Sequence, residues 1–112
     1  MSSAVATRLD AIKSHAGVKA REIALLLDTT PQTVSRWQQG HVDPQPTKLQ
    51  HLLALEWLTD QLAEFYEPDE ARLWLFSPHR LLAGQRPADK IAEGDADAVL
   101  TIIDQLRDGA YL

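Results

Sequence analysis

The chain has 112 residues, no cysteine and a formal net charge of −5. A chain of this length folds as one domain or as two small subdomains sharing a core, and the lack of cysteine excludes disulfides and thiolate metal sites. The four histidines are scattered without the spacing of metal ligands, so we expect no metal site. The first ten residues lack the apolar run of a signal peptide and no stretch reaches membrane-spanning length, so we expect a cytoplasmic protein.

Charge is divided unevenly between the two halves of the chain. Residues 1–50 carry six basic and four acidic side chains, a charge of +2, whereas residues 51–112 carry five basic and twelve acidic side chains, a charge of −7. This division predicts a first half that faces DNA and a second half that faces another partner. A charge of +2 is weak for nucleic-acid binding, so useful DNA affinity would require a dimer or a larger assembly.

The first helix is predicted over residues 3–15. Val5, Leu9 and Ile12 recur at helical spacing and share one face, and Gly17 provides a natural stop. This helix therefore has one apolar side with which to enter a core.

Residues 19–40 are predicted to form two short helices joined by a tight turn. The apolar pattern stops at residues 28–30 and resumes with Val34 and Trp37, and Pro31 suits the first turn of the second helix. This is the spacing of a helix-turn-helix, whose second helix exposes side chains able to read a major groove. Together with the capping threonine before that helix, the candidate DNA-binding residues are Thr30, Gln32, Thr33, Ser35 and Arg36.

Two interpretations of this stretch stay open. A pair of helices with an exposed polar face also occurs in helical domains that never bind DNA. The turn, the capped Pro31 and the terminating Gly40 favour DNA binding, and the stretch resembles the helix-turn-helix modules of the Xre and Cro/repressor family. Those modules usually have glycine at the turn where this chain has Asp28, a residue that tolerates a left-handed backbone better than most.

A connector with two prolines, HVDPQP, is the candidate linker between a helix-turn-helix domain at residues 1–46 and a second domain at residues 47–112. After it, Thr47 is expected to cap a helix of about 20 residues from Lys48 to Tyr66. Its apolar residues are Leu49, Leu52, Leu53, Leu55, Trp57, Leu58, Leu62 and Phe65. A helix with this many apolar residues is expected to pack on both sides, where it would join the two halves of the chain or form a dimer interface. The alternative is that it is an ordinary helix of the core.

Prolines punctuate the starts of three further short helices. Pro68 and Pro87 are expected in the first turns of two of them, and Ser77-Pro78 in the cap and first turn of the helix between them. The last helix is expected to start near Asp95 and to stop at Gly109. No segment alternates apolar and polar residues for long, so the fold class is all-α: a helix-turn-helix bundle followed by a compact multi-helix domain, with about seven to eight helices.

The run WLFSPHRLLAGQRPADKI at residues 74–91, followed by Gly94 and VLTIIDQL, resembles the toxin-binding domain of the Xre/MbcA/ParS antitoxin family. The resemblance covers about residues 50–112, and the preceding helix-turn-helix matches that family's usual arrangement. It implies a type II antitoxin that neutralises a RES-domain toxin, which uses NAD, and that represses its own operon. In that family the extreme C-terminus reaches toward the toxin's NAD pocket, which on this chain assigns toxin binding to Asp108, Gly109, Ala110, Tyr111 and Leu112.

The residues themselves leave alternatives open. Tyr111 and Leu112 could instead fold back on the chain's own core. Arg80 and Arg86, which we also assign to toxin binding, could instead brace the turns together with Asp89. The alternative function is a stand-alone helix-turn-helix repressor whose C-terminal half only dimerises.

The expected partners are a cognate RES-type toxin, operator DNA, and further copies of the chain in a homodimer or a larger hetero-oligomer with the toxin. No clustered His and acid constellation and no phosphate-cradling glycine loop occurs in the sequence. We therefore predict neither an enzyme nor a bound cofactor.

Overall fold

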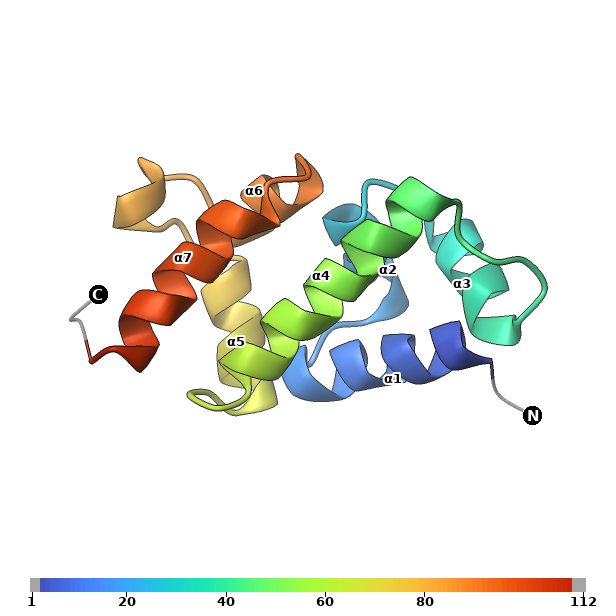
Figure 1. Ribbon diagram of the computed structural model, residues 1–112, viewed down its shortest axis with the longest axis horizontal. Helices are drawn as coiled ribbons and strands as arrows, with labels where there is room; N and C mark the ends of the chain where they lie inside the picture. Colours follow the sequence, from blue (N-terminus) through green and yellow to red (C-terminus); the bar gives the residue numbers. More distant parts are fainter. Residues whose placement is uncertain (1–2, 110–112) are drawn as a thin grey trace.

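The computed structural model describes residues 3–109, which form seven α-helices, one short 3-10 turn and no strand. The elements are α1 (Ala4–Ala16), α2 (Ala20–Leu26), α3 (Pro31–Gln39), α4 (Pro46–Leu62), α5 (Pro68–Leu75), the 3-10 turn η1 (Arg80–Leu82), α6 (Pro87–Ala92) and α7 (Ala96–Arg107). The all-α prediction is confirmed. The molecule is elongated, 43 × 23 × 20 Å, with α3 and the C-terminal end of α7 at opposite ends (Figure 1).

The central element is α4, which packs against α1 on one side and α7 on the other (Figure 1). Its Leu52, Leu55, Leu58 and Leu62 are fully buried and recur every three or four residues along one stripe. The helix therefore joins the two halves of the chain, which is one of the two roles that its apolar pattern predicted.

Both ends of α4 differ from the prediction. The helix begins at Pro46, whose missing N–H suits the first position, so the N-cap is Gln45 rather than Thr47. It ends at Leu62, where the chain enters a tight turn in which the Phe65 N–H donates to the Leu62 carbonyl at 2.9 Å. Phe65 consequently leaves the apolar stripe and is 39% exposed.

Two apolar side chains of α4 face outward instead of widening the buried stripe. Leu53 is 37% exposed and Trp57 is 58% exposed. They border a hollow of about 390 Å³ whose other lining residues are Arg8, His15, Glu56 and Asp60. This face of α4 is therefore not part of the core.

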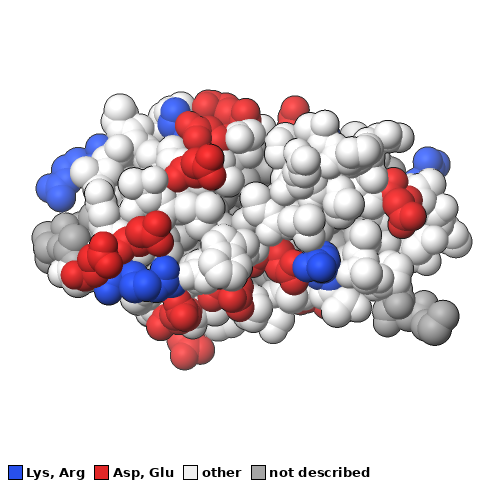
Figure 2. Space-filling view, in the orientation of Figure 1, with Lys and Arg blue, Asp and Glu red and all other residues white. Residues whose placement is uncertain are grey.

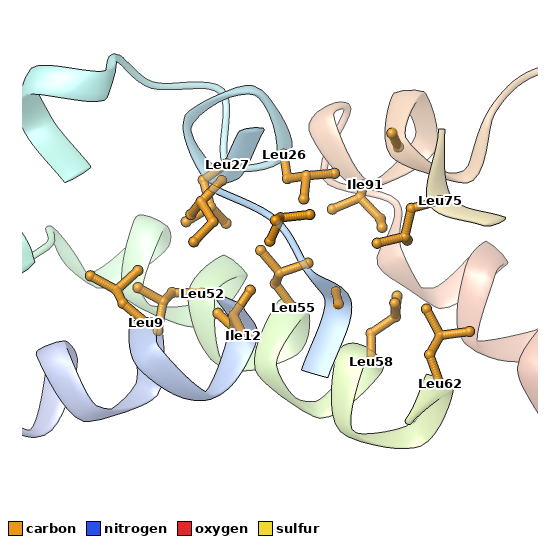
Figure 3. Packing of buried hydrophobic residues seen from close by; sticks show 14 of the residues in the cluster. Leu9, Ile12, Leu26, Leu27, Leu52, Leu55, Leu58, Leu62, Leu75 and Ile91 are labelled. Carbon is orange, nitrogen blue, oxygen red and sulfur yellow. The ribbon is translucent and has the colours of Figure 1, made fainter. Parts of the chain in front are cut away.

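One hydrophobic core runs through both halves of the chain. Figure 3 shows Leu9 and Ile12 of α1 beside Leu52 and Leu55 of α4, with Leu75 of α5 among the residues at the other end of the same cluster. The predicted helix-turn-helix and C-terminal regions thus bury apolar surface against each other.

The proline-led starts of two short helices are confirmed. Pro68 and Pro87 occupy the first turns of α5 and α6. The start of α7 is also confirmed, since the Asp95 carboxylate accepts a hydrogen bond from the Ala98 N–H at 3.3 Å. None of the helices in residues 3–109 combines the length and the apolar character that crossing a bilayer requires.

The start predicted at Ser77-Pro78 is wrong. The N-cap of η1 is His79, whose Nδ1 accepts a hydrogen bond from the Leu81 N–H at 3.2 Å. The Ser77 hydroxyl instead donates to the Leu73 carbonyl at 2.6 Å, near the end of α5. The serine hydroxyl is therefore engaged by the preceding helix, and the His79 side chain caps the following turn.

Candidate functional site

The turn between α2 and α3 has the predicted capping chemistry. Thr30 Oγ1 accepts a hydrogen bond from the Thr33 N–H at 3.1 Å, and the two threonine hydroxyls are 2.9 Å apart and share a further bond. Pro31 follows at the first helical position. Asp28 adopts a left-handed conformation with φ of 52°, which is the role that glycine usually has in such turns.

The orientation of α3 agrees with a recognition helix. Val34 and Trp37 are buried, as predicted, and Thr33 is half-buried. The exposed candidates on this helix are Gln32, Ser35 and Arg36. Arg36 has no ion pair with any acidic residue among residues 3–109, so its guanidinium is available to an incoming acceptor.

Gln38, which the sequence analysis did not single out, fixes α3 against α1. Its amide nitrogen donates to Asp10 Oδ1 at 3.1 Å, and its amide oxygen accepts from Lys13 Nζ at 3.1 Å. These contacts hold α3 at one angle to α1. The sequence gives no signal for them, because the partners are 25 or more positions apart.

The turn is also tied to α4. Lys48 Nζ donates to the Leu27 carbonyl at 2.6 Å. Three of the six basic residues in the first half are therefore engaged within the chain, namely Arg8, Lys13 and Lys48. The basic residues that α2 and α3 themselves carry are Arg21 and Arg36, so the positive charge on these two helices is small.

At the other end of the molecule, Arg86 braces the start of α6. Its guanidinium donates to Asp89 Oδ1 at 2.7 Å, and Asp89 Oδ2 accepts from the Arg86 backbone N–H at 3.3 Å. The hydrogen bond from Arg86 holds the pKa of the Asp89 carboxyl below its usual value. The ring of Phe76 lies 5.8 Å from the Arg86 guanidinium and 5.6 Å from that of Arg72. Arg86 has the bracing contacts expected of it, and its role in toxin binding stays a prediction.

Arg80 lies on a well-fixed loop. The His79 N–H donates to the Gln85 carbonyl at 2.9 Å, and the His79 ring meets the Trp74 ring edge-on at 5.7 Å between centroids. Arg80 and the 48%-exposed Leu81 project from this loop into solvent. A charged and an apolar side chain side by side on a rigid turn suit protein recognition.

The C-terminal candidates begin where α7 ends. Gly109 has φ of 79°, and its N–H donates to the Leu106 carbonyl at 3.1 Å, so it stops the helix as predicted. Asp108 is exposed beside it. The remaining candidates, Ala110, Tyr111 and Leu112, lie outside the described residues. Arg107, which the sequence analysis missed, connects this end of α7 to α4.

On the face that Figure 2 shows, the surface charge follows the division seen in the sequence. In Figure 2, acidic side chains gather over the half of the molecule that contains α6 and α7, whereas fewer charges cover the half that contains α2 and α3. The two candidate surfaces, on α3 and at the end of α7, therefore differ in both chemistry and location.

Comparison with known proteins decides the family. Residues 56–109 match the antitoxin Xre/MbcA/ParS C-terminal toxin-binding domain. The mycobacterial cidal antitoxin MbcA of Mycobacterium tuberculosis is 38% identical over 96 residues, which cover 86% of this chain and 85% of that protein. The chain belongs to the Xre/MbcA/ParS antitoxin family.

Other relatives extend the likeness of this antitoxin along nearly its whole length. A probable mycobacterial cidal antitoxin of Mycobacterium tuberculosis is 31% identical over 104 residues, which cover 93% of this chain and 88% of the relative. The crystal structure of the M. tuberculosis MbcT–MbcA toxin–antitoxin complex contains a chain with a TM-score of 0.85 and 34% identity, covering 98% of this chain and 99% of that one. The resemblance drawn from residues 74–91 is confirmed, and the fold of the whole antitoxin is shared.

Proposed function

We propose that this antitoxin binds and neutralises a cognate, NAD-consuming toxin of the RES type, with residues 108–112 blocking the toxin's active site in a type II system. The match of residues 56–109 to a toxin-binding domain supports a toxin partner, as does the likeness to a chain of a toxin–antitoxin complex. We propose that the antitoxin acts in the cytoplasm, because the proposed toxin uses NAD, which is a cytoplasmic metabolite.

The observation that carries the proposal is the geometry at the end of α7. Gly109 is exposed and left-handed, and an added Cβ there would meet none of the described atoms within 4 Å, so α7 ends at an open surface. Tyr111 and Leu112 follow it, an aromatic and an aliphatic side chain suited to an apolar slot. We assign Arg80 on η1 and Arg86 at the start of α6 to the flanking contact with the toxin.

The test is co-expression of the antitoxin with the protein encoded beside it. The neighbour alone should deplete cellular NAD and stop growth, and the complete antitoxin should co-purify with it and restore both. A chain lacking residues 109–112 should keep its helical content by circular dichroism and lose neutralisation. Full neutralisation by the truncated chain would overturn active-site blocking by the tail.

We further propose that α3 binds operator DNA and represses the antitoxin's own operon. The exposed Gln32 and Arg36 support this role, as does the contact of Gln38 that orients the helix. The alternative is a stand-alone repressor whose C-terminal half only dimerises. That alternative predicts tight operator binding without a toxin and no dependence of function on residues 109–112.

Operator binding by so weakly basic a chain requires more than one copy, so we propose a homodimer or a larger hetero-oligomer with the toxin. Leu53 and Trp57 on α4 support self-association, because they are exposed apolar side chains on one helix face. Sedimentation of the antitoxin alone and with the toxin distinguishes a monomer, a homodimer and a hetero-oligomer.

A further inference from the structure

Arg107, the last residue of α7, contacts four other side chains. Its Nη2 donates to Gln61 Oε1 and to Glu64 Oε2, and its Nη1 donates to Asp104 Oδ1 at 3.3 Å. The guanidinium carbon also lies 5.9 Å from the centre of the Phe65 ring. One side chain thus connects the end of α7 with the end of α4 and with the turn after it.

The contact with Gln61 distinguishes this cluster from an ordinary surface ion pair. Gln61 is 8% exposed and, with Thr59, is one of two buried polar residues among residues 3–109. A buried amide oxygen without a donor is strongly unfavourable, so its bond to Arg107 is maintained where an exposed pair would be transient. Because Gln61 is fixed within α4, the last turn of α7 is held at a fixed position on the core.

Arg107 stands two residues before Gly109, where the chain leaves the helix. Helix ends fray readily, and a frayed last turn would leave Gly109 without a fixed position. A last turn anchored to α4 holds Gly109 at one place on the surface. Ordering this helix end before binding reduces the entropy lost when a partner binds to it and to the residues after it.

We infer that Arg107 is the positioning residue of this antitoxin: through Gln61 and Glu64 it holds the end of α7, and this fixed helix end strengthens the binding of residues 109–112 to the toxin. The inference rests on the proposed function and adds to it the residue that fixes the helix end from which residues 109–112 continue. Arg107 itself acts through the end of α7 and need not touch the toxin's active site.

A double-mutant cycle tests this role. The dissociation constant for the purified cognate toxin is measured for the complete antitoxin, for Arg107→Ala, for the chain lacking residues 109–112, and for both changes together. We expect Arg107→Ala to weaken binding by about tenfold in the complete chain and to have little further effect in the truncated chain. An equal loss in both backgrounds would show a merely structural or direct contact role and would overturn the inference.

Arg72→Ala is the matched control. Arg72 also reaches a carboxylate on another helix, Glu22, and also lies against an aromatic ring, that of Phe76 at 5.6 Å. Arg72→Ala should reduce toxin binding equally in the complete and truncated chains, because Arg72 lies on α5 and its partners are Glu22 of α2 and Phe76. A coupling to the tail as large as that of Arg107 would show that loss of any such arginine acts through general stability.

Two further results keep the outcome clear. Arg107→Lys retains the charge that faces Glu64 but lacks the planar guanidinium that also reaches Gln61, so it should bind the toxin with intermediate affinity. If Arg107→Ala folds poorly, Arg107→Lys takes its place in the cycle. If the truncated chain binds and neutralises as well as the complete one, blocking by the tail fails and the inference fails with it. If truncation weakens neutralisation without coupling to position 107, only the inference fails.

Discussion

Lys48 of α4 donates through Nζ to the backbone carbonyl of Asp28, in the turn between α2 and α3, at 2.8 Å. The same ammonium group donates to the Leu27 carbonyl. Lys48→Met keeps the apolar stem and removes the donor, so both carbonyls lose a charged partner. We expect the free energy of unfolding to fall by about 1–2 kcal/mol, measured by urea denaturation. Lys90→Met, which breaks only an i,i+3 pair with Glu93, should cost less than about 0.5 kcal/mol. Similar losses in the two variants would contradict a bracing role for Lys48.

Gly17, which ends α1, lies against the start of α5. A Cβ added at Gly17 would stand 2.9 Å from the Pro68 carbonyl oxygen, whereas one added at Gly40 would meet nothing within 4 Å. Both glycines are left-handed, with φ of 63° and 78°, so alanine at either position is strained by about 1 kcal/mol. Gly17→Ala should destabilise the chain by at least about 1 kcal/mol more than Gly40→Ala, because backbone must also move. Thermal unfolding followed by circular dichroism gives this difference, and equal midpoints would contradict the close contact.

Glu22 of α2 pairs with Arg72 of α5, and its side chain is only 12% exposed. Burial alone would raise the pKa of Glu22, but the hydrogen bonds from Arg72 and from the Lys19 N–H outweigh it and hold the pKa below the usual 4.5. A carboxyl whose pKa is lower in the folded chain stabilises the fold above its usual pKa, and this stability is lost as pH falls through the lowered value.

The stability of the antitoxin should therefore decrease as pH falls from about 5 to about 3. Glu22→Gln should be less stable at neutral pH and should lose less stability over that interval. Asp89 remains in both chains and contributes equally to the slope, since Arg86 lowers its pKa in each. Urea denaturation at several pH values measures the two slopes, and parallel slopes would show that the Glu22 pair does not contribute.

The parts of the fold that the sequence predicted depend on local chemistry. Thr30 caps α3, Pro68 and Pro87 start α5 and α6, and Asp95 caps α7, because capping and proline geometry act within a few residues. The start predicted at Ser77-Pro78 was wrong because the His79 ring caps η1, while the Ser77 hydroxyl donates back to the Leu73 carbonyl of α5.

The contacts that position the candidate surfaces were not predictable in this way. Lys48 and Asp28 are 20 positions apart, and Arg107 and Gln61 are 46 positions apart. Helical periodicity gives the face of a residue but not which neighbouring helix covers that face. Trp57 shows the limit: its spacing suited a wide apolar stripe, yet α1 and α7 leave it 58% exposed.

The last prediction concerns the exposed side chains of α3. If Gln32 and Arg36 read bases, replacing each with alanine should weaken operator binding by about 1–3 kcal/mol. Fluorescence anisotropy at one fixed salt concentration measures this with the operator and with unrelated DNA. The loss should be larger on the operator, because a base contact carries specificity and a phosphate contact does not. Lys90→Ala on α6 removes one positive charge from another part of the molecule and should leave operator binding unchanged. Equal weakening on both DNAs would assign Gln32 and Arg36 to the phosphate backbone, and no weakening on either would assign α3 to packing or assembly.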